Sequence, residues 1–261
     1  LLKFLNIVRR DIRMKALAFG EVLWDVYTTD AYLGGATMNF AAHFKKCGGE
    51  SWIVTAVGND SMGKKTVEEI RKLDINTKFI SFVEQQTGKC LVTLDDNQIP
   101  SYDLLDNVAY DYIKKPDIDN EAFDVLYFGT LALRNENNKT VLKQILSENC
   151  FNDIFVDMNI RAPYYNKDVV RFACKNATIL KISDEELPVV MDLLEKERLS
   201  VRECAKNMHK EFANLNIIII TMGSKGSLVY DFRSNKCYEC DAKKVNVVST
   251  VGAGDSFSAA F

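Results

Sequence analysis

The feature that most constrains the fold is the regular alternation of short apolar runs with segments whose apolar residues recur at helical spacing. Strand followed by helix, repeated along a chain, is typical of right-handed βαβ units. We therefore expect an α/β fold, with a doubly wound, mainly parallel sheet that carries helices on both faces. The strand-like runs are 15–20, 52–57, 125–129, 154–157, 178–182 and 217–221, and the helical patterns include 40–47, 67–73, 141–146 and 187–194.

Two stretches, about 25–35 and 87–105, interrupt this alternation. Both contain short alternating β runs without a helix of their own, and Asp95-Asp96-Asn97-Gln98 is typical of a hairpin turn. We expect these stretches to leave the main sheet and form a small β lid. The sequence has no linker, repeat or low-complexity tract, so we predict a single domain over residues 14–261, preceded by an extension over residues 1–13.

Composition narrows the class of protein. The chain has 33 basic and 36 acidic side chains, a net charge of −3 and no long basic run, so it lacks the electrostatic footprint of a nucleic-acid-binding protein. The strongest apolar run, 217–220, is far shorter than the ~20 residues of a membrane span, and we expect no membrane insertion.

The seven cysteines show no regular disulfide framework, which suits reduced thiols in the cytoplasm. Cys237 and Cys240 have the spacing of a metal knuckle, but no second pair follows, so zinc is not predicted.

The most informative candidate site lies at the end of the sequence. The β-branched run 245–248 precedes Gly252-Ala253-Gly254, and helix-favouring residues follow Asp255, which predicts a strand-to-helix loop over 252–254 with Asp255 on the first turn of the helix. Glycines let backbone N–H groups approach a phosphate closely, and a helix N-terminus adds unpaired donors. The residues alone leave two interpretations open: a site for developing negative charge with Asp255 as a base, or a tight turn whose aspartate caps a helix.

The whole of 249–261 resembles the C-terminal signature of the PfkB (ribokinase-like) carbohydrate kinases. In that family the aspartate after Gly-Ala-Gly deprotonates the sugar hydroxyl. The resemblance therefore implies that Asp255 is the catalytic base and that the amides of Gly252, Ala253 and Gly254 hold the transferring phosphoryl group. Many relatives have an acid where this chain has Ser249, near a monovalent-cation site of some members, so a requirement for K⁺ is left open.

A distant stretch, 33–41, resembles the N-terminal signature of the same family: a Gly-Gly hinge and then an asparagine on the first turn of a helix. The resemblance implies that Asp25 and Asn39 hydrogen-bond sugar hydroxyls, and that Gly34 and Gly35 give close backbone approach and the hinge of the lid. Carboxylate and amide groups suit a polyol, because they combine acceptors and donors that can discriminate hydroxyl patterns. Taken alone, Asp25 would equally suit a loop or a lid surface.

The middle of the chain is most similar to bacterial fructokinases, at 88–89, 94–95, 100–102, 107–111 and 157–163. The similarity implies that Tyr102 contacts the sugar and that Arg161 reaches toward the sugar and the γ-phosphate. A planar cation suits charge that is spread over phosphoryl oxygens. The alternatives are packing within the lid for Tyr102 and a surface ion pair for Arg161.

The segment 181–186 corresponds to the Asn-x-x-Glu region of the family, with Ser183 in place of the asparagine. It implies a nucleotide-site role for Lys181 and a contact of Glu186 with Mg²⁺ through water. An acid that opens a helix also stabilises it through the helix dipole.

The segment 221–226 resembles the nucleotide loop of the family. The resemblance places Thr221 and Gly223 near the phosphates and ribose, and Gly226 near the edge of the nucleotide. ATP and Mg²⁺ are thus the expected cofactors.

These resemblances imply an ATP-dependent sugar kinase, with fructose as the acceptor and fructose 6-phosphate as the product. The alternatives are a kinase of the same family for ribose, 2-keto-3-deoxygluconate or a nucleoside, and a catalytically silent sugar-binding or regulatory protein on the same fold. In the family the lid often pairs with its counterpart, so a homodimer through the β lid is a further expectation. Relatives usually continue with helices that help to line the adenine pocket, so either a tail follows Phe261 or the nucleotide site is incomplete.

Overall fold

The computed structural model describes residues 13–94, 100–118, 121–247 and 250–261. Its main sheet has nine strands in the order β13-β12-β11-β10-β9-β8-β1-β4-β5. The neighbours from β5 to β11 are parallel, and β12 and β13 add two antiparallel strands at one edge. The mainly parallel α/β fold expected from the alternation is confirmed. The strands are β1 Lys15–Phe19, β4 Glu50–Gly58, β5 Ile80–Val83, β8 Val125–Gly129, β9 Asp153–Asp157, β10 Ile179–Ser183, β11 Ile217–Thr221, β12 Ser227–Asp231 and β13 Lys236–Cys240.

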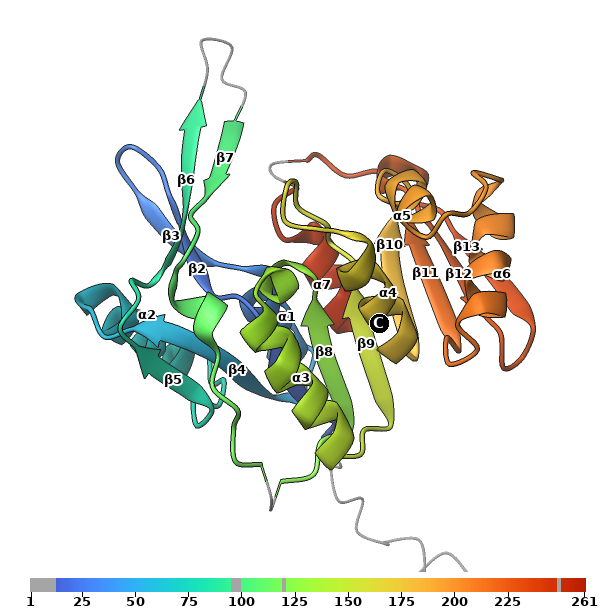
Figure 1. Cartoon of the computed structure of the whole chain (residues 1–261). Helices are drawn as coiled ribbons and strands as arrows, with labels where there is room; N and C mark the ends of the chain where they lie inside the picture. The colour runs from blue at the N-terminus through green and yellow to red at the C-terminus, as the bar shows by residue number, and fades with distance from the viewer. Residues whose placement is uncertain (1–12, 95–99, 119–120, 248–249) are drawn as a thin grey trace, which may run out of the picture.

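Helices cover both faces of this sheet, and Figure 1 shows α3 and α4 in front of β8 and β9. Along β1, Leu17 and Phe19 belong to a core cluster with residues of α3 to α6, whereas Ala16 and Ala18 belong to a second cluster with residues of α1 and α7. Because both faces of the strands are buried, the strands are apolar throughout. The helices are α1 Ala36–Lys46, α2 Ser61–Lys72, α3 Glu136–Glu148, α4 Lys167–Asn176, α5 Leu187–Leu193, α6 Val201–Glu211 and α7 Ala253–Ala260, with short 3₁₀ turns η1 Ala109–Tyr112, η2 Leu131–Arg134 and η3 Gly223–Lys225.

The helix N-termini fall into two groups. Polar side chains cap α2, α3, α4 and α6 by accepting a backbone N–H of the first turn; they are Asp60, Asn135, Asn166 and Ser200. By contrast, α1 and α7 begin after glycines with positive φ, Gly35 at 99° and Gly252 at 74°, and neither has a side-chain cap. The N-cap residues of α1 and α7 therefore satisfy none of the first-turn backbone donors, and the first N–H of α1 is instead accepted by the Glu21 side chain.

A second sheet of four strands stands on the side toward which β8 and β9 point (Figure 1). Its order is β3-β2-β6-β7, from β2 Leu23–Val26, β3 Ala31–Gly34, β6 Gly88–Leu94 and β7 Pro100–Leu104. The expected small sheet is thus present, and its strands come from the two stretches that interrupt the alternation. The hairpin turn predicted at Asp95-Asp96-Asn97-Gln98 lies outside the described residues. Residues 1–12 of the predicted extension also lie outside them. The lid role and the single-domain division stay predictions.

One local prediction is wrong. Residues 245–247 of the β-branched run are exposed and form no strand, and the helix begins at Ala253, so Ala253 and Gly254 lie in its first turn and not in a loop. Asp255 lies in the first turn, as predicted. β13 is the edge strand of the sheet, and the described residues 245–247 pair neither with it nor with another strand. A β propensity without a partner strand does not produce a strand.

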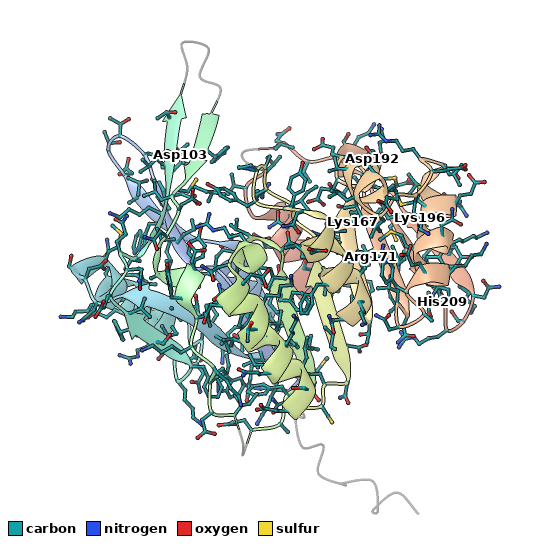
Figure 2. All side chains as sticks on the ribbon, in the orientation of Figure 1. Asp103, Lys167, Arg171, Asp192, Lys196 and His209 are labelled. Atoms are coloured by element: carbon teal, nitrogen blue, oxygen red, sulfur yellow. The ribbon has the colours of Figure 1, made fainter. Side chains whose placement is uncertain are left out.

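Charged side chains around α4, α5 and α6 are of mixed sign (Figure 2). Arg171 and Lys196 both contact the carboxylate of Glu211, at 2.7 and 3.0 Å. His209 stacks on Phe232 with ring centroids 3.9 Å apart, which gives this histidine a packing role. Among the helices that the structure describes, none is long and apolar enough to cross a membrane.

Candidate active site

A cavity of about 400 Å³ lies between the second sheet, the ends of β1, β9 and β10, and the first turn of α7. Carboxyl ends of parallel strands are where ligands of open α/β sheets are expected to bind. The predicted site residues that line the cavity are Asp25, Gly35, Asn39, Tyr102, Arg161, Lys181, Gly252, Gly254 and Asp255. A larger hollow of about 930 Å³ runs along α1 and α7 and is lined by none of the predicted site residues. We therefore take the smaller cavity as the candidate site.

The two segments with family signatures meet in this cavity. Asn39 Nδ2 on α1 donates to Asp255 Oδ2 on α7 at 2.8 Å, although 216 positions separate the two residues. The backbone at Gly35 lets α1 start this close, because a Cβ there would lie 2.7 Å from the Glu21 carbonyl oxygen and its φ of 99° favours glycine. The hydrogen bond holds one oxygen of Asp255.

The electrostatic surroundings of Asp255 favour a carboxylate of increased basicity. Burial raises the pKa of Asp255 and the nearby Asp157 raises it further, whereas the Asn39 hydrogen bond, Lys181 and Arg161 lower it. The net direction is upward. A carboxylate whose pKa is raised toward the working pH is a better proton acceptor than an ordinary one.

Behind Asp255, a buried ion pair joins β9, β10 and α7. Lys181 Nζ lies 2.7 Å from Asp157 Oδ2, and the Ser258 hydroxyl donates to the same oxygen at 2.9 Å. A Cβ at Gly254 would lie 3.2 Å from Lys181 Nζ, so the ammonium group lies directly beside the first turn of α7. Lys181 and the start of α7 thus place positive charge together at one end of the cavity.

The second sheet contributes the opposite wall. Asp25 on β2 is half-buried, and burial raises the pKa of its carboxyl group. Tyr102 on β7 lines the cavity while 53% of its surface is exposed. Arg161, in the loop after β9, lines the same cavity and is exposed. Gly34 packs against Asp25, since a Cβ there would lie 2.8 Å from Asp25 Oδ2.

Glu186 lies at the start of α5 with both carboxylate oxygens occupied. Oε1 accepts the N–H of Ile160 and Oε2 that of Ser183, each at 2.8 Å. Burial raises the pKa of Glu186. The described residues contain no cluster of three metal-ligating side chains, so they do not fit a metal cage. They fit Mg²⁺ that arrives with nucleotide phosphates and keeps its own waters, which Glu186 could contact through its remaining lone pairs.

The predicted nucleotide loop does not line the cavity. Thr221 ends β11, where its carbonyl accepts the N–H of Asp184 at 2.8 Å, and Gly223 opens η3 with open space around it. Gly226 has a packing reason to be glycine, because a Cβ would lie 1.9 Å from the Cys240 carbonyl oxygen.

Among the amides predicted to hold the phosphoryl group, that of Ala253 donates to the Thr250 carbonyl at 3.2 Å. Ser249 lies outside the described residues, so the open question on K⁺ stays where the sequence left it.

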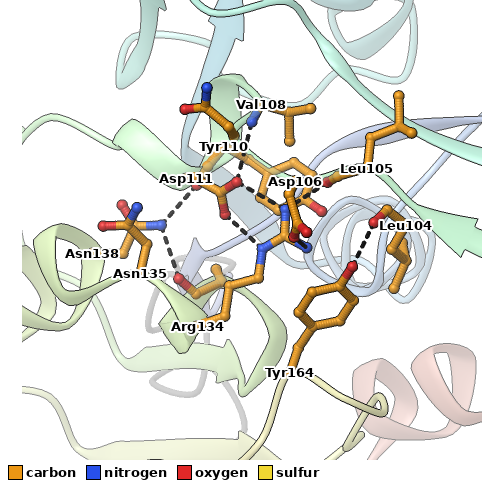
Figure 3. Close-up of polar contacts among 12 residues, drawn as sticks. Leu104, Leu105, Asp106, Val108, Tyr110, Asp111, Arg134, Asn135, Asn138 and Tyr164 are labelled. Carbon is orange, nitrogen blue, oxygen red and sulfur yellow. Dashed lines mark hydrogen bonds and ion pairs between the residues drawn. The ribbon is translucent and has the colours of Figure 1, made fainter.

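Below the second sheet, a cluster around Arg134 ties that sheet to the main domain (Figure 3). Arg134 Nε and Nη2 bind the two carboxylate oxygens of Asp111, each at 2.8 Å, and Nη2 also donates to the Leu105 carbonyl at 2.7 Å. The guanidinium lies 5.0 Å from the ring centre of Tyr110 and 4.5 Å from that of Tyr164. The Tyr164 hydroxyl donates to the carbonyl of Leu104, the last residue of β7, at 2.7 Å.

Three groups in or near the site were not assigned from the sequence: Glu21, Asp157 and Arg134. Glu21 lies two residues after the end of β1 and Asp157 ends β9, so a carboxylate near the end of an apolar strand is the signal that could have identified both. Arg134 sits in a short turn with no motif around it, and only the folded chain brings it to Asp111.

A mainly parallel sheet, a small sheet over its strand ends and a polar cavity between them define the ribokinase-like class of fold. The family model described as pfkB family carbohydrate kinase matches residues 6–261, and the chain belongs to this family. The resemblance inferred from the two signatures is thereby confirmed.

The relatives carry different names. The chain is 29% identical over 249 residues to a putative sugar kinase from Pyrococcus horikoshii, covering 91% of this chain and 74% of the relative. It is 26% identical over 281 residues to an ATP-dependent 6-phosphofructokinase from Thermoanaerobacterium thermosaccharolyticum, covering 98% and 83%. The crystal structure of the Pyrococcus protein in complex with ATP matches with a TM-score of 0.77 at 25% identity, over 94% of this chain and 82% of that one. A double mutant of the Vibrio cholerae fructokinase, with fructose, ADP and potassium bound, matches with a TM-score of 0.79 at 20% identity, over 94% and 81%, which is a likeness of fold.

Proposed function

We propose that this sugar kinase transfers the γ-phosphoryl group of ATP to a hydroxyl of fructose and releases fructose 6-phosphate. The observation that supports this most is the contact of Asn39 with Asp255 in a cavity that Asp25 and Arg161 also line. The proposed proton acceptor, the groups proposed to bind the polyol and the cations thus line the same cavity. ATP as the donor agrees with the ATP-bound structure of the Pyrococcus sugar kinase.

In the proposed mechanism, Asn39 holds Asp255 Oδ2 and leaves Oδ1 to accept the proton of the attacking hydroxyl. Arg161, Lys181 and the first-turn amides of α7 stabilise the charge on the phosphoryl oxygens as transfer proceeds. Mg²⁺ bound to the nucleotide would supply neutralisation of its phosphate charge. The nucleotide-loop residues Thr221, Gly223 and Gly226 hold the remainder of ATP in this proposal.

The role of Asp255 is tested with Asp255→Asn. The amide cannot accept the proton, so we expect turnover to fall by about 10²–10⁴-fold while fructose still binds. Asp168→Asn is the matched control, because Asp168 is an exposed carboxylate in the first turn of α4 and its loss should leave turnover unchanged. Turnover of the Asp255 variant near that of the wild type would mean that another group is the base.

The acceptor is tested by competition. Fructose, ribose, 2-keto-3-deoxygluconate, adenosine and fructose 6-phosphate are supplied together at equal concentration, and mass spectrometry identifies the phosphorylated products. We expect fructose to exceed each rival in kcat/KM by at least about tenfold, because unpaired buried groups cost about 1–3 kcal/mol each. A different dominant product would replace fructose and keep the kinase assignment. Failure to phosphorylate any acceptor would favour the silent sugar-binding protein.

A further inference from the structure

The mechanism above leaves Glu21, a buried acid of the cavity wall, unused. Glu21 follows β1 and is only 2% exposed, yet it lines the cavity together with Asp25, Asn39 and Asp255. Its Oε1 accepts the N–H of Ala36, the first residue of α1, at 3.0 Å. Among the described residues, Glu21 Oε2 has no hydrogen-bond partner. A buried polar atom without a partner is rare in folded proteins and indicates that a group outside the protein completes the site.

The position of Glu21 makes a bound acceptor the partner that fits best. Oε1 secures the carboxyl group to the start of α1, the helix that carries Asn39, so the two oxygens have separate tasks. Asn39 in turn contacts Asp255, the proposed base. A hydroxyl that reaches Asp255 therefore belongs to a molecule held in the cavity whose wall includes Glu21.

We propose that Glu21 is an additional sugar-binding residue. Its Oε2 forms a hydrogen bond with a second hydroxyl of the sugar, and the protonation of the Glu21 carboxyl group sets the affinity for the sugar. This inference rests on the proposed function for its ligand. The protonated carboxyl donates to a hydroxyl oxygen, and a bound sugar further separates the carboxyl group from solvent, which disfavours its ionised form.

Burial places the titration of Glu21 near neutrality. It raises the pKa of Glu21 to about 7, although the backbone N–H groups of Glu21 and Ala36 lower the pKa by donating to the carboxylate. The charge of Asp255 on α7 raises the pKa further and that of Arg161 lowers it. In the described part of the chain, the hydroxyls of Tyr110 on η1 and Tyr127 on β8 also interact with Glu21. Because the protonated form binds the sugar better, the sugar dissociation constant should rise as the pH passes upward through this pKa.

The test measures fructose binding by calorimetry without ATP, between pH 6 and pH 9. In the wild type the dissociation constant should rise about tenfold, as expected if binding shifts the pKa of Glu21 by about one unit. Glu21→Gln keeps an oxygen for Ala36 and offers a permanent donor to the sugar, so its affinity should stay near the wild-type value at pH 6 and lose most of the rise. Asp25 and Asp255 remain in this variant, so any residual pH dependence belongs to them.

Glu21→Ala is the complementary variant and should bind fructose at least about tenfold more weakly at pH 6, since it lacks the donor. If this variant does not fold, the Gln comparison decides alone. Equal pH profiles for the wild type and Glu21→Gln would overturn the proposal, as would a folded Ala variant with wild-type affinity. Phosphorylation of fructose is assayed separately, so the proposed function can fail while Glu21-dependent binding holds, and the reverse.

Discussion

Two buried ion pairs in this kinase have similar geometry and different surroundings. Arg134 and Asp111 lie 2.8 Å apart with side chains 7% and 4% exposed, and Lys181 and Asp157 lie 2.7 Å apart at 8% and 2%. Arg134 is enclosed by carboxylate oxygens, a carbonyl and two aromatic rings (Figure 3). Lys181 has three donors, places one on Asp157 and lines the cavity.

The comparison indicates that the role of a buried cation depends on whether it lines a cavity, and not on the ion pair itself. The Nε and Nη2 donors of Arg134 end on protein atoms, its Nη1 lies 3.4 Å from the Asp106 carboxylate, and the residue does not line the cavity, so this guanidinium is a structural tie between the second sheet and the main sheet. An ammonium that faces a cavity with donors to spare can bind an anion there. Removing one partner of a buried pair leaves an uncompensated charge, whereas access to water reduces that cost.

The largest expected effect comes from Arg134→Met. It leaves the Asp111 carboxylate buried without its cation, so the free energy of unfolding should fall by about 3–5 kcal/mol in urea titration. Arg171→Met is the matched control, because Arg171 is half-exposed and pairs with Glu211, and its loss should cost less than about 1 kcal/mol. Similar losses for both variants would mean that the Arg134 cluster is not a structural tie.

Lys181→Met should lower the free energy of unfolding less than Arg134→Met does, but it should weaken the binding of ATP. Asp157 keeps the Ser258 hydroxyl and lies beside the cavity, so we expect a loss of about 1–3 kcal/mol in the free energy of unfolding. The dissociation constant for ATP should rise about tenfold or more, since a hydrogen bond to a charged group contributes about 1.5–3 kcal/mol. Lys196→Met, on the surface near Glu211, serves as the control. Unchanged ATP affinity in a folded Lys181 variant would make this pair structural as well.

The smallest effect is expected for Tyr164→Phe. The ring stays on Arg134, but the hydrogen bond from its hydroxyl to the Leu104 carbonyl is lost, which should cost about 0.5–1.5 kcal/mol in unfolding free energy. ATP affinity should not change, because this contact belongs to the tie and not to the cavity. A weakened ATP affinity would show that the two pairs are coupled.

Much of the fold could be predicted because burial on both faces leaves a strong pattern in the chain. The runs 125–129 and 217–221 coincide with β8 and β11 residue for residue. The run 245–248 shows the limit, since its β-branched residues have the propensity of a strand but the described residues 245–247 pair with no strand. The roles of Thr221, Gly223, Gly226 and Glu186 stay predictions, because they depend on a nucleotide and its metal.

The sequence by itself determined the α/β alternation, the family signatures and the residue types that surround Asp255. Only the tertiary structure decided which distant groups share a cavity, because the ends of separate strands converge only when the sheet forms. It brought Asn39 to Asp255, and it showed that Glu21 is buried with one oxygen unpaired. It also separated the roles of Arg134 and Lys181. The groups that surround a buried cation come from residues far apart along the chain, so the local sequence does not reveal them.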